Sequence, residues 1–442
     1  MPDRSRRLRT RRRSRRIAAR SLIAALLLAP SACSEREPAT DDAFAVSALL
    51  SAPRAPKPGF RGSSGFRLTQ NTIQLNAQIG TASATDTFVL DSGAPMTIAP
   101  RLGRDLGLAS LAQVSLAGPE GGVRSVPVTL IPEVRVAGVP FRDVGAVIDW
   151  VEPPSELACL SVDGLMGASL LQAAIWQIDF QTRQINVTDR LNDLPGLDGA
   201  MRIAFARSDE SGSPRIEVGV SDRDDVSLLV DLGFNGSLAI PAALFEESGN
   251  RLASDAPTEN GEASTTVFGA TSSAVRIGRL REFRIGDLRL ADFPVVTGDS
   301  VSDFHVGIEF LRHFRVTLDW LNDDLYLEPI DPENALYDDF ASYGFKPQLR
   351  DGQLVVGALW QSSTAERAGL ELGDRLLEID GRSTESPDFA VLCDVLDAIG
   401  LFGWNEAPIA VVVQRAEERK TIRIARAPLL NSPDDSDQDA DD

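Results

Sequence analysis

The chain has 442 residues and a formal net charge of −20, which comes from 64 acidic and 44 basic side chains. A chain of this length can form about three domains of ordinary size, each able to bury a core. The strongly acidic composition argues against nucleic acid and anionic lipid headgroups as binding partners.

The first 33 residues are typical of an export signal. Ten arginines and one acidic residue lie in the first 20 positions, and an uncharged apolar run follows over residues 22–29. That run is too short to span a bilayer as a permanent helix. Ala32-Cys33 then resembles a bacterial lipoprotein cleavage site, which implies that the mature protein begins at a lipidated Cys33.

The lipoprotein resemblance implies a location in the periplasm or cell envelope. Ser34 follows the cysteine where an Asp would signal inner-membrane retention, so we expect an outer-membrane lipoprotein that contacts the membrane through its lipid anchor only. A soluble periplasmic form that begins at Ala32 is the alternative, and both Sec and Tat export stay open. Residues 34–65 are rich in Ser, Ala, Pro and Gly, which predicts a flexible tether.

One sequence pattern then occurs twice, 140 residues apart. In each copy an apolar strand runs into a turn, Asp91-Ser92-Gly93 in the first and Asp231-Leu232-Gly233 in the second. The correspondence continues for about 90 residues, through the pairs Asp163/Asp303, Gly167/Gly307, Leu171/Leu311 and Asp179/Asp319. A repeat that keeps its register for so long predicts two copies of one folding unit, each offering one carboxylate.

Both copies are predicted to be built from β-strands. Short alternating apolar runs are separated by Gly, Pro and Asp, and no long helix is indicated. The pattern places a first lobe over residues 66–190, a connection over 190–199 and a second lobe over 200–330. A polar, Gly- and Ser-rich stretch over residues 253–273 is a candidate loop over a cleft in the second lobe.

These residues resemble the retropepsin-like aspartic proteases in a tandem, single-chain form, over about residues 67–330. The family pattern is D-[ST]-G-A after an apolar strand, then an apolar segment that ends in Gly before a short helix. The resemblance implies two pseudo-twofold-related β-barrel lobes of the acid protease fold in a monomeric protease unit. It also implies that Asp91 and Asp231 share a proton and activate one water against polypeptide substrates, with no cofactor or metal.

The turns depart from the family pattern at Leu232. In the family, the residue after each Asp carries a hydroxyl that hydrogen-bonds the opposite turn. Ser92 has that hydroxyl and Leu232 lacks it, so half of the cross-lobe bonding is missing and Asp231 is expected to be less firmly placed. Gly93 and Gly233 complete the two turns. This departure keeps a second interpretation open, that of a pseudoprotease that binds peptides without cleaving them.

In the family that these residues resemble, a Gly-containing hairpin of the first lobe, the flap, closes over the substrate. Residues 114–123 match this hairpin. Gly118, Gly121 and Gly122 are the flap candidates because three glycines would let a hairpin bend. An ordinary hairpin loop is the alternative. Ala94 and Phe234 stand where acid-optimum members carry a Ser or Thr that stabilises the ionised carboxylate. Their replacement by apolar residues predicts activity closer to neutral pH.

The C-terminal part of the chain resembles a bacterial PDZ domain over residues 338–428. Tyr343-Gly344-Phe345 matches the loop that binds a C-terminal carboxylate, so C-terminal peptides are the implied partners. Residues 388–399 are expected to form the groove helix, and residues 409–413 and 421–424 the closing strands. The alternative is a module that packs on the second lobe and binds nothing. Residues 429–442 are expected to be an acidic, disordered tail.

Other chemistries find little support in the sequence. The two histidines, His305 and His313, are interpreted as structural, and no exposed serine suggests a Ser-His-Asp triad. Cys159 and Cys393 lie in apolar segments, which favours buried free thiols over a disulfide. The acid pairs 224–225, 323–324 and 338–339 are interpreted as solvated turns. The sequence therefore predicts an exported aspartic endopeptidase with a C-terminal PDZ domain.

Overall fold

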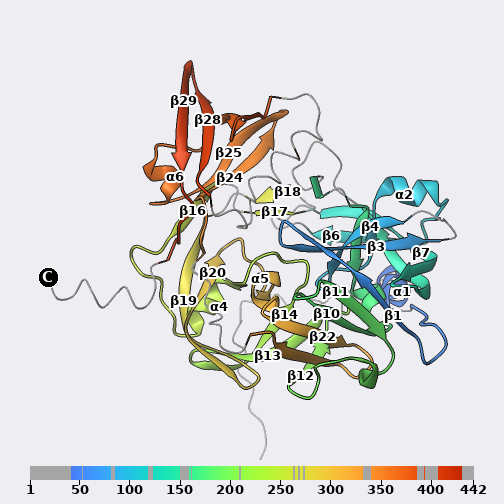
Figure 1. Cartoon of the computed structure of the whole chain (residues 1–442). Coiled ribbons are helices and arrows are strands. Elements are labelled where there is room, and N and C mark those ends of the chain that lie inside the picture. The colour runs from blue at the N-terminus through green and yellow to red at the C-terminus, as the bar shows by residue number, and fades with distance from the viewer. Residues whose placement is uncertain are drawn as a thin grey trace, which may run out of the picture. The chain divides into compact units, whose positions relative to one another are not determined.

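The computed structural model describes residues 41–51, 53–80, 85–117, 123–149, 159–160, 162–208, 211–261, 264–266, 269–271, 274–331, 340–385, 393 and 407–430. All of them belong to the compact unit Thr40–Asp442. The protein is all-β, with short helices between the strands (Figure 1). No helix in the described ranges is long and apolar enough to cross a membrane.

Six strands of the first lobe close into a barrel. Neighbours follow round the ring in the order β3-β4-β9-β5-β8-β7, and β7 pairs back onto β3. Their bounds are β3 (Thr72–Ile79), β4 (Asp86–Asp91), β9 (Gly164–Gly167), β5 (Thr97–Ile98), β8 (Val139–Ile148) and β7 (Val123–Val136). The lobe also contains β2 (Arg67–Thr69), β6 (Ala112–Ala117), α2 (Pro100–Asp105) and α3 (Ala168–Leu171). Alternate residues of these strands, such as Phe88 and Leu90, fill the barrel interior.

The second lobe repeats this ring strand for strand. Its order is β13-β14-β21-β15-β20-β19, with β19 paired back onto β13. The bounds are β13 (Pro214–Val220), β14 (Arg223–Val230), β21 (His305–Val306), β15 (Leu238–Pro241), β20 (Leu288–Gly298) and β19 (Val275–Ile285), with α4 (Ala242–Glu247) and α5 (Ile308–Leu311). The 140-residue sequence repeat is therefore a repeat of one barrel.

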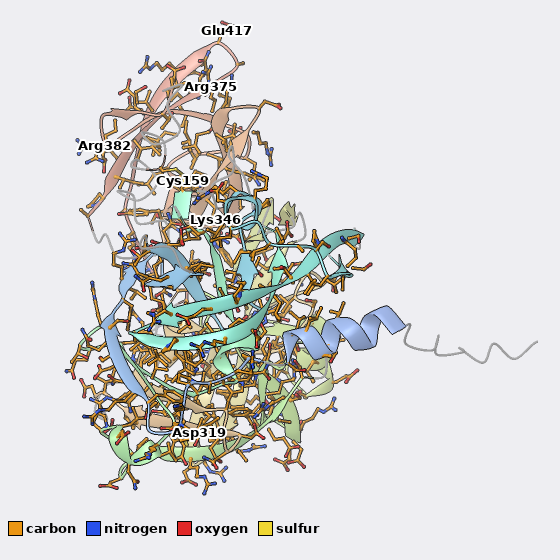
Figure 2. The ribbon with its side chains drawn as sticks, turned by 90° about the vertical axis from the view of Figure 1, so that its right-hand side faces the viewer. Cys159, Asp319, Lys346, Arg375, Arg382 and Glu417 are labelled. Carbon is orange, nitrogen blue, oxygen red and sulfur yellow. A yellow bond between two sulfur atoms is a disulfide. The ribbon has the colours of Figure 1, made fainter. Side chains whose placement is uncertain are left out.

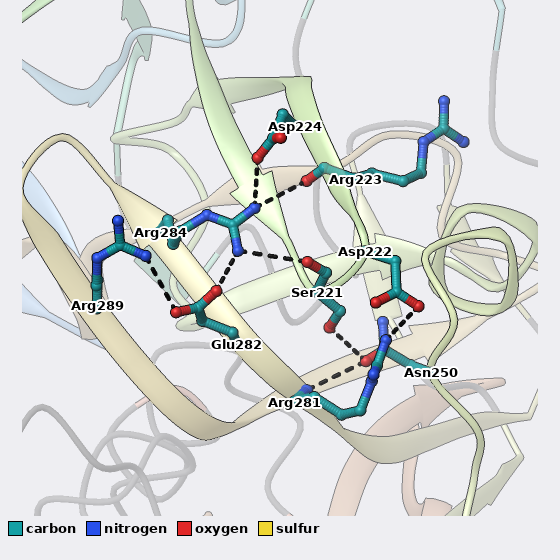
Figure 3. Close-up of polar contacts among 9 residues, drawn as sticks. All are labelled: Ser221, Asp222, Arg223, Asp224, Asn250, Arg281, Glu282, Arg284 and Arg289. Carbon is teal, nitrogen blue, oxygen red and sulfur yellow. Dashed lines mark hydrogen bonds and ion pairs between the residues drawn. The ribbon is translucent and has the colours of Figure 1, made fainter.

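A polar network fastens one end of the second barrel (Figure 3). Arg284 of β19 donates to Asp224 over 2.6 Å and to the backbone oxygens of Ser221 and Arg223, on the hairpin between β13 and β14. Asn250 accepts from the Ser221 hydroxyl over 2.6 Å. Asp224 is exposed, as expected for a solvated turn, but Asp324 of another predicted turn is buried against Arg202.

A six-stranded sheet joins the two lobes, and each lobe contributes three strands. The order is β1 (Arg61–Gly65), β11 (Gln184–Thr188), β10 (Ile175–Asp179), β22 (Phe314–Asp319), β23 (Asp324–Pro329) and β12 (Met201–Arg207). The antiparallel contact between β10 and β22 is the seam. The short helix η2 (Leu191–Asp193) lies in the connection between the lobes.

The prediction of a flexible tether over residues 34–65 is wrong for the residues of this range that the structure describes. α1 (Asp41–Leu50) buries Val46 and Leu50 against Val128 of the first barrel. β1 then pairs with β11 in the joining sheet, in the position that β12 occupies in the second lobe. Because this segment is rich in Ser, Pro and Gly, its composition did not predict strand β1, whose small residues lie at the edge of the sheet. Cys33 lies outside the described residues.

The C-terminal segment forms a small β-unit with its own apolar core. Its elements are β24 (Phe345–Arg350), β25 (Gln353–Trp360), α6 (Thr364–Arg367), β26 (Arg375–Ile379), β27 (Arg382–Ser383), β28 (Ile409–Arg415) and β29 (Glu418–Ile424). The predicted closing strands are present as β28 and β29. Of the predicted groove helix only Cys393 lies in the described ranges. Leu430, in the predicted disordered tail, is buried beside Trp360.

A strand pairing and a disulfide are among the contacts that join this unit to the lobes in the described residues. β16 (Thr258–Gly261) of the second lobe pairs with β25. The buried Glu259 forms an ion pair with Lys346, which is labelled in Figure 2, and the Lys346 Nζ lies 2.8 Å from Glu259 Oε2. Cys159 of the first lobe forms a disulfide with Cys393. The prediction of two free thiols is therefore wrong, because the fold brings together two cysteines that are 234 positions apart. The hairpin β17 (Ser264–Thr266) and β18 (Gly269–Thr271) follows β16.

Candidate active site

The two Asp–X–Gly turns meet between the barrels. Asp91 is the last residue of β4 and pairs with Gly167 of β9. Asp231 directly follows β14, and its backbone N–H donates to Val306 of β21 over 2.9 Å. The preceding residues Leu90 and Val230 are fully buried, whereas Asp91 and Asp231 are half-buried as whole residues. Each apolar strand thus ends by presenting a carboxyl at the junction of the lobes.

The two glycines let the carboxyls come together. A Cβ atom on Gly93 would lie 2.9 Å from Oδ1 of Asp231, and a Cβ on Gly233 would lie 2.6 Å from Oδ2 of Asp91. Each glycine therefore lies against the carboxyl of the other lobe, where any side chain would collide. Each glycine N–H also donates to the Asp of its own turn over 2.8 Å. Glycine is needed here for close approach.

The pKa values of both carboxyl groups are raised above the ordinary value for Asp. Burial raises the pKa of Asp91, although hydrogen bonds from the Gly93 and Ala94 backbone and with Asp231 oppose this rise. Burial and the charge of Asp91 raise the pKa of Asp231 to about 7. Two carboxyls so close cannot both ionise without mutual repulsion, so the pair titrates as one unit. Between the two ionisations it holds a single proton and a single negative charge.

The cross-lobe hydroxyl bond is present in one direction. Ser92 is fully buried, donates its hydroxyl to the Val230 oxygen over 2.6 Å and accepts from the Leu232 N–H over 2.9 Å. Ser92 thus holds the turn of Asp231 on both sides. The expectation that Leu232 leaves Asp231 loosely placed is therefore wrong. The turn without an opposing hydroxyl is that of Asp91.

The sequence did not predict a further contact between the lobes, which Asn71 makes. Asn71, in the turn between β2 and β3, is almost fully buried at a positive φ of 55°. Its side-chain amide donates to the Asn235 oxygen, four residues after Asp231, and to Glu309 over 3.0 Å. Asn tolerates this backbone region better than most non-glycine residues. The one sequence signal for this cross-lobe contact is an asparagine in a turn.

The surroundings of the two carboxyls differ between the lobes. Phe234 and His305 lie on the Asp231 side, with ring centroids 4.3 Å apart, where the first lobe has Ala94 and Leu165. His305, which the sequence analysis interprets as structural, lies on β21, and this strand pairs with β14 directly before Asp231. Parallel pairing between distant segments gave no signal in the sequence.

The remaining predicted site residues are only partly described. β6 and β7 form an antiparallel hairpin whose last pair is Ala117 and Val123, and Gly118, Gly121 and Gly122 lie between them outside the described residues. Tyr343 and Phe345 are buried in the core of the C-terminal unit. Gly344 has a φ of 88° and packs against Ser363. A peptide there would meet backbone groups rather than these two side chains.

Comparisons with known proteins give a limited result. No protein-family model and no curated protein matches the chain. Among solved structures, the crystal structure of aspartic proteinase from Irpex lacteus is similar, with a TM-score of 0.39 and 12% sequence identity. The alignment covers 63% of this chain and 100% of that chain. The geometry of the two turns therefore carries the functional argument.

Proposed function

We propose that the protein is an aspartic endopeptidase that hydrolyses peptide bonds with Asp91 and Asp231. The observation that carries the proposal is the reciprocal contact of each carboxyl with the glycine of the opposite turn. This contact places two carboxyls with raised pKa values at the junction of two barrels, where they can share one proton. Such a pair can supply a general base and a general acid together.

The hydrolytic step follows from the charge state of the pair. The ionised carboxyl takes a proton from a water molecule, whose oxygen adds to the peptide carbonyl carbon. The protonated carboxyl donates its proton to the carbonyl oxygen, which gives a neutral tetrahedral diol. As the diol collapses, one of its hydroxyls returns a proton to the carboxylate that had acted as the acid, the C–N bond breaks, and the departing amine takes the proton that the base had accepted. The pair returns to its starting state.

The test compares wild-type protein with Asp91→Asn and Asp231→Asn on unfolded polypeptides between pH 3 and 8. Asp292→Asn is the matched control, because it removes an exposed carboxylate that pairs with Arg279 away from the dyad. We expect cleavage by wild type and by the control, and a loss of at least about 10³-fold in both dyad variants. Equal cleavage by all four proteins, or none by wild type, would contradict the proposal.

A second candidate is a peptide-binding pseudoprotease, which Leu232 favours because the Asp91 turn lacks an opposing hydroxyl. The same panel separates the two functions when peptide binding is measured beside cleavage. Wild type that binds unfolded polypeptides but never cleaves them would establish the pseudoprotease.

The C-terminal unit is proposed to be a PDZ domain that binds polypeptide C-termini. Gly344 at a positive φ directly precedes β24, and β24 pairs with β25 alone among the described strands. An extended peptide could add to its other edge. Fluorescence anisotropy tests this proposal by comparing the binding of peptides that have a free C-terminus with that of the same peptides amidated at the C-terminus. Equal binding of the two forms would contradict carboxylate recognition.

The protein is also proposed to act in the cell envelope, anchored through a lipid on Cys33. The disulfide supports this location, because such bonds persist in oxidising compartments and are rare in the cytosol. Mass spectrometry of the mature N-terminus is the test. An unmodified N-terminus at Ala32 would indicate a soluble periplasmic form instead.

A further inference from the structure

His305 lies on the same face of the second barrel as Asp231. β21 runs parallel to β14 with His305 beside Leu229 and Val306 beside Val230. Val230 and Val306 are fully buried, so the alternate residues Leu229, Asp231 and His305 point to the opposite, partly exposed face. An imidazole and the dyad therefore share one surface of the sheet.

Phe234 connects the imidazole to the carboxyl. Its ring contacts the His305 ring edge to face, with centroids 4.3 Å apart, and its backbone N–H donates to Asp231 Oδ1 over 3.2 Å. His305 is thus fixed at short range from Asp231 without a direct hydrogen bond to it in the contacts described. The interaction between them is one of charge.

The other charged groups near His305 largely cancel. Asp303, two positions earlier, forms a bidentate ion pair with Arg215 of β13, at 2.7 and 2.8 Å. β15, on the other side of β21, places the uncharged Ala239 beside His305. The charge that remains uncompensated is the single negative charge of the Asp91–Asp231 pair. Burial lowers the pKa of His305, which favours the neutral imidazole, and the charges of Asp231 and Asp303 oppose this shift.

We propose that His305 is a positioning residue that acts through the charge of Asp231. In acid the His305 imidazolium stabilises the negative charge of the dyad. It thereby lowers the pKa of the second protonation, which would abolish activity. Near neutral pH the imidazole is uncharged and leaves the proton on the dyad undisturbed. His305 therefore extends the singly protonated state to lower pH. The inference rests on the proposed function where it concerns catalysis, whereas the charge interaction between His305 and the dyad can be tested without it.

An NMR titration tests the charge coupling without any need for activity. The chain has two histidines, so His313→Gln leaves His305 as the only imidazole signal. Its pKa is compared with that in the same background carrying Asp91→Asn and Asp231→Asn. Loss of the dyad charge is expected to lower the pKa of His305 further, because an attractive charge has been removed. An unchanged pKa would overturn the proposal.

A pH–rate series tests the consequence for catalysis. His305→Gln is expected to lower kcat/KM at pH 4 relative to pH 6 by at least about threefold and to leave the alkaline limb in place. His305→Lys, a permanent cation, should move both limbs to lower pH. His305→Leu copies Leu165 of the first lobe and guards against a packing defect, and His313→Gln is the control.

The outcomes separate the two proposals. A uniform fall in activity at every pH would assign His305 a merely structural role and overturn the inference while the peptidase stands. An inactive wild type combined with a dyad-dependent His305 pKa would remove the peptidase and keep the charge coupling. An inactive wild type with an unchanged pKa would remove both.

Discussion

Gln177 and Thr317 are counterparts in the 140-residue repeat, and they also hydrogen-bond each other, with Gln177 Nε2 3.1 Å from Thr317 Oγ1. They face each other where β10 meets β22, with Trp176 opposite Leu318 on one side. A residue can meet its own counterpart in an antiparallel pair only where a twofold axis passes between the two. The pseudo-twofold axis of the molecule therefore crosses this pair, and it also relates Asp91 to Asp231.

Thr317→Val is expected to lower the free energy of unfolding by about 1 kcal/mol, because one buried hydrogen bond is lost. Gln177 keeps its bond to the Pro195 oxygen at 2.9 Å in that variant. Gln177→Leu should cost more, since it also leaves Pro195 and Asn186 without their partner. Urea denaturation measures both. A larger loss in Thr317→Val than in Gln177→Leu would contradict the assignment.

Ser92→Ala is expected to lower the free energy of unfolding by about 2–4 kcal/mol, because it strands a buried carbonyl and a buried N–H of the opposite lobe. Ser227→Ala is a matched control on β14, since its hydroxyl lies in an exposed contact with Arg215. The control should change stability by less than about 0.5 kcal/mol. Equal effects of the two substitutions would argue against a cross-lobe role for Ser92.

Leu232→Thr restores a hydroxyl opposite the Asp91 turn. We expect higher peptidase activity at an unchanged pH optimum, because the added bonds place a carboxyl without altering its electrostatic surroundings. The comparison requires kcat/KM at several pH values. A moved optimum would mean that the new hydroxyl bonds a carboxylate rather than the backbone.

Asp231→Asn is expected to stabilise the protein above neutral pH, by about 1–3 kcal/mol at pH 8. The pKa of Asp231 is raised to about 7 on folding, so the folded chain holds a proton that the unfolded chain releases near pH 4. The stabilisation from that proton is present in acid and falls as pH rises toward 7. Asn has no proton to lose. Thermal melts at pH 4 and pH 8 should show the gain only at the higher pH.

Peptidase activity should follow a bell-shaped pH profile centred between about pH 5 and 7. Both carboxyl pKa values are raised, chiefly by burial, and Ala94 and Phe234 supply no side-chain donor that would oppose this. The alkaline limb reports loss of the shared proton. An optimum below about pH 4 would contradict the raised pKa values.

Cys393→Ser should lower the melting temperature, with a loss of about 2–4 kcal/mol in unfolding free energy. The disulfide closes a loop of 234 positions and so restricts the unfolded chain strongly. Cys159→Ser should have the same effect, and the double variant no more than either one. Additive losses would show that the cysteines act separately.

The sequence predicted the parts of the molecule that depend on local pattern. The repeat located both carboxyls, both glycines and the missing hydroxyl, because each turn has the same order of residue types. It could not predict that Ser92 holds Asp231, since that bond depends on which lobe reaches across the axis. Cys159 with Cys393, and His305 with Asp231, are brought together by long-range pairing that no local pattern records. Residues 61–65 lack apolar alternation, so β1 gave no strand signal.

The position of α1 in the sequence limits how far a protein anchored at Cys33 could stand from a membrane. α1 begins at Asp41, so a lipid on Cys33 would be followed by residues 34–40 alone before the first packed helix. A fully extended chain of that length reaches about 25 Å, against about 110 Å for a tether that ended at residue 65. In an anchored molecule the start of α1 would therefore lie within about 25 Å of the lipid-bearing residue. A lipid-anchored form of the proposed peptidase would meet its substrates close to the membrane.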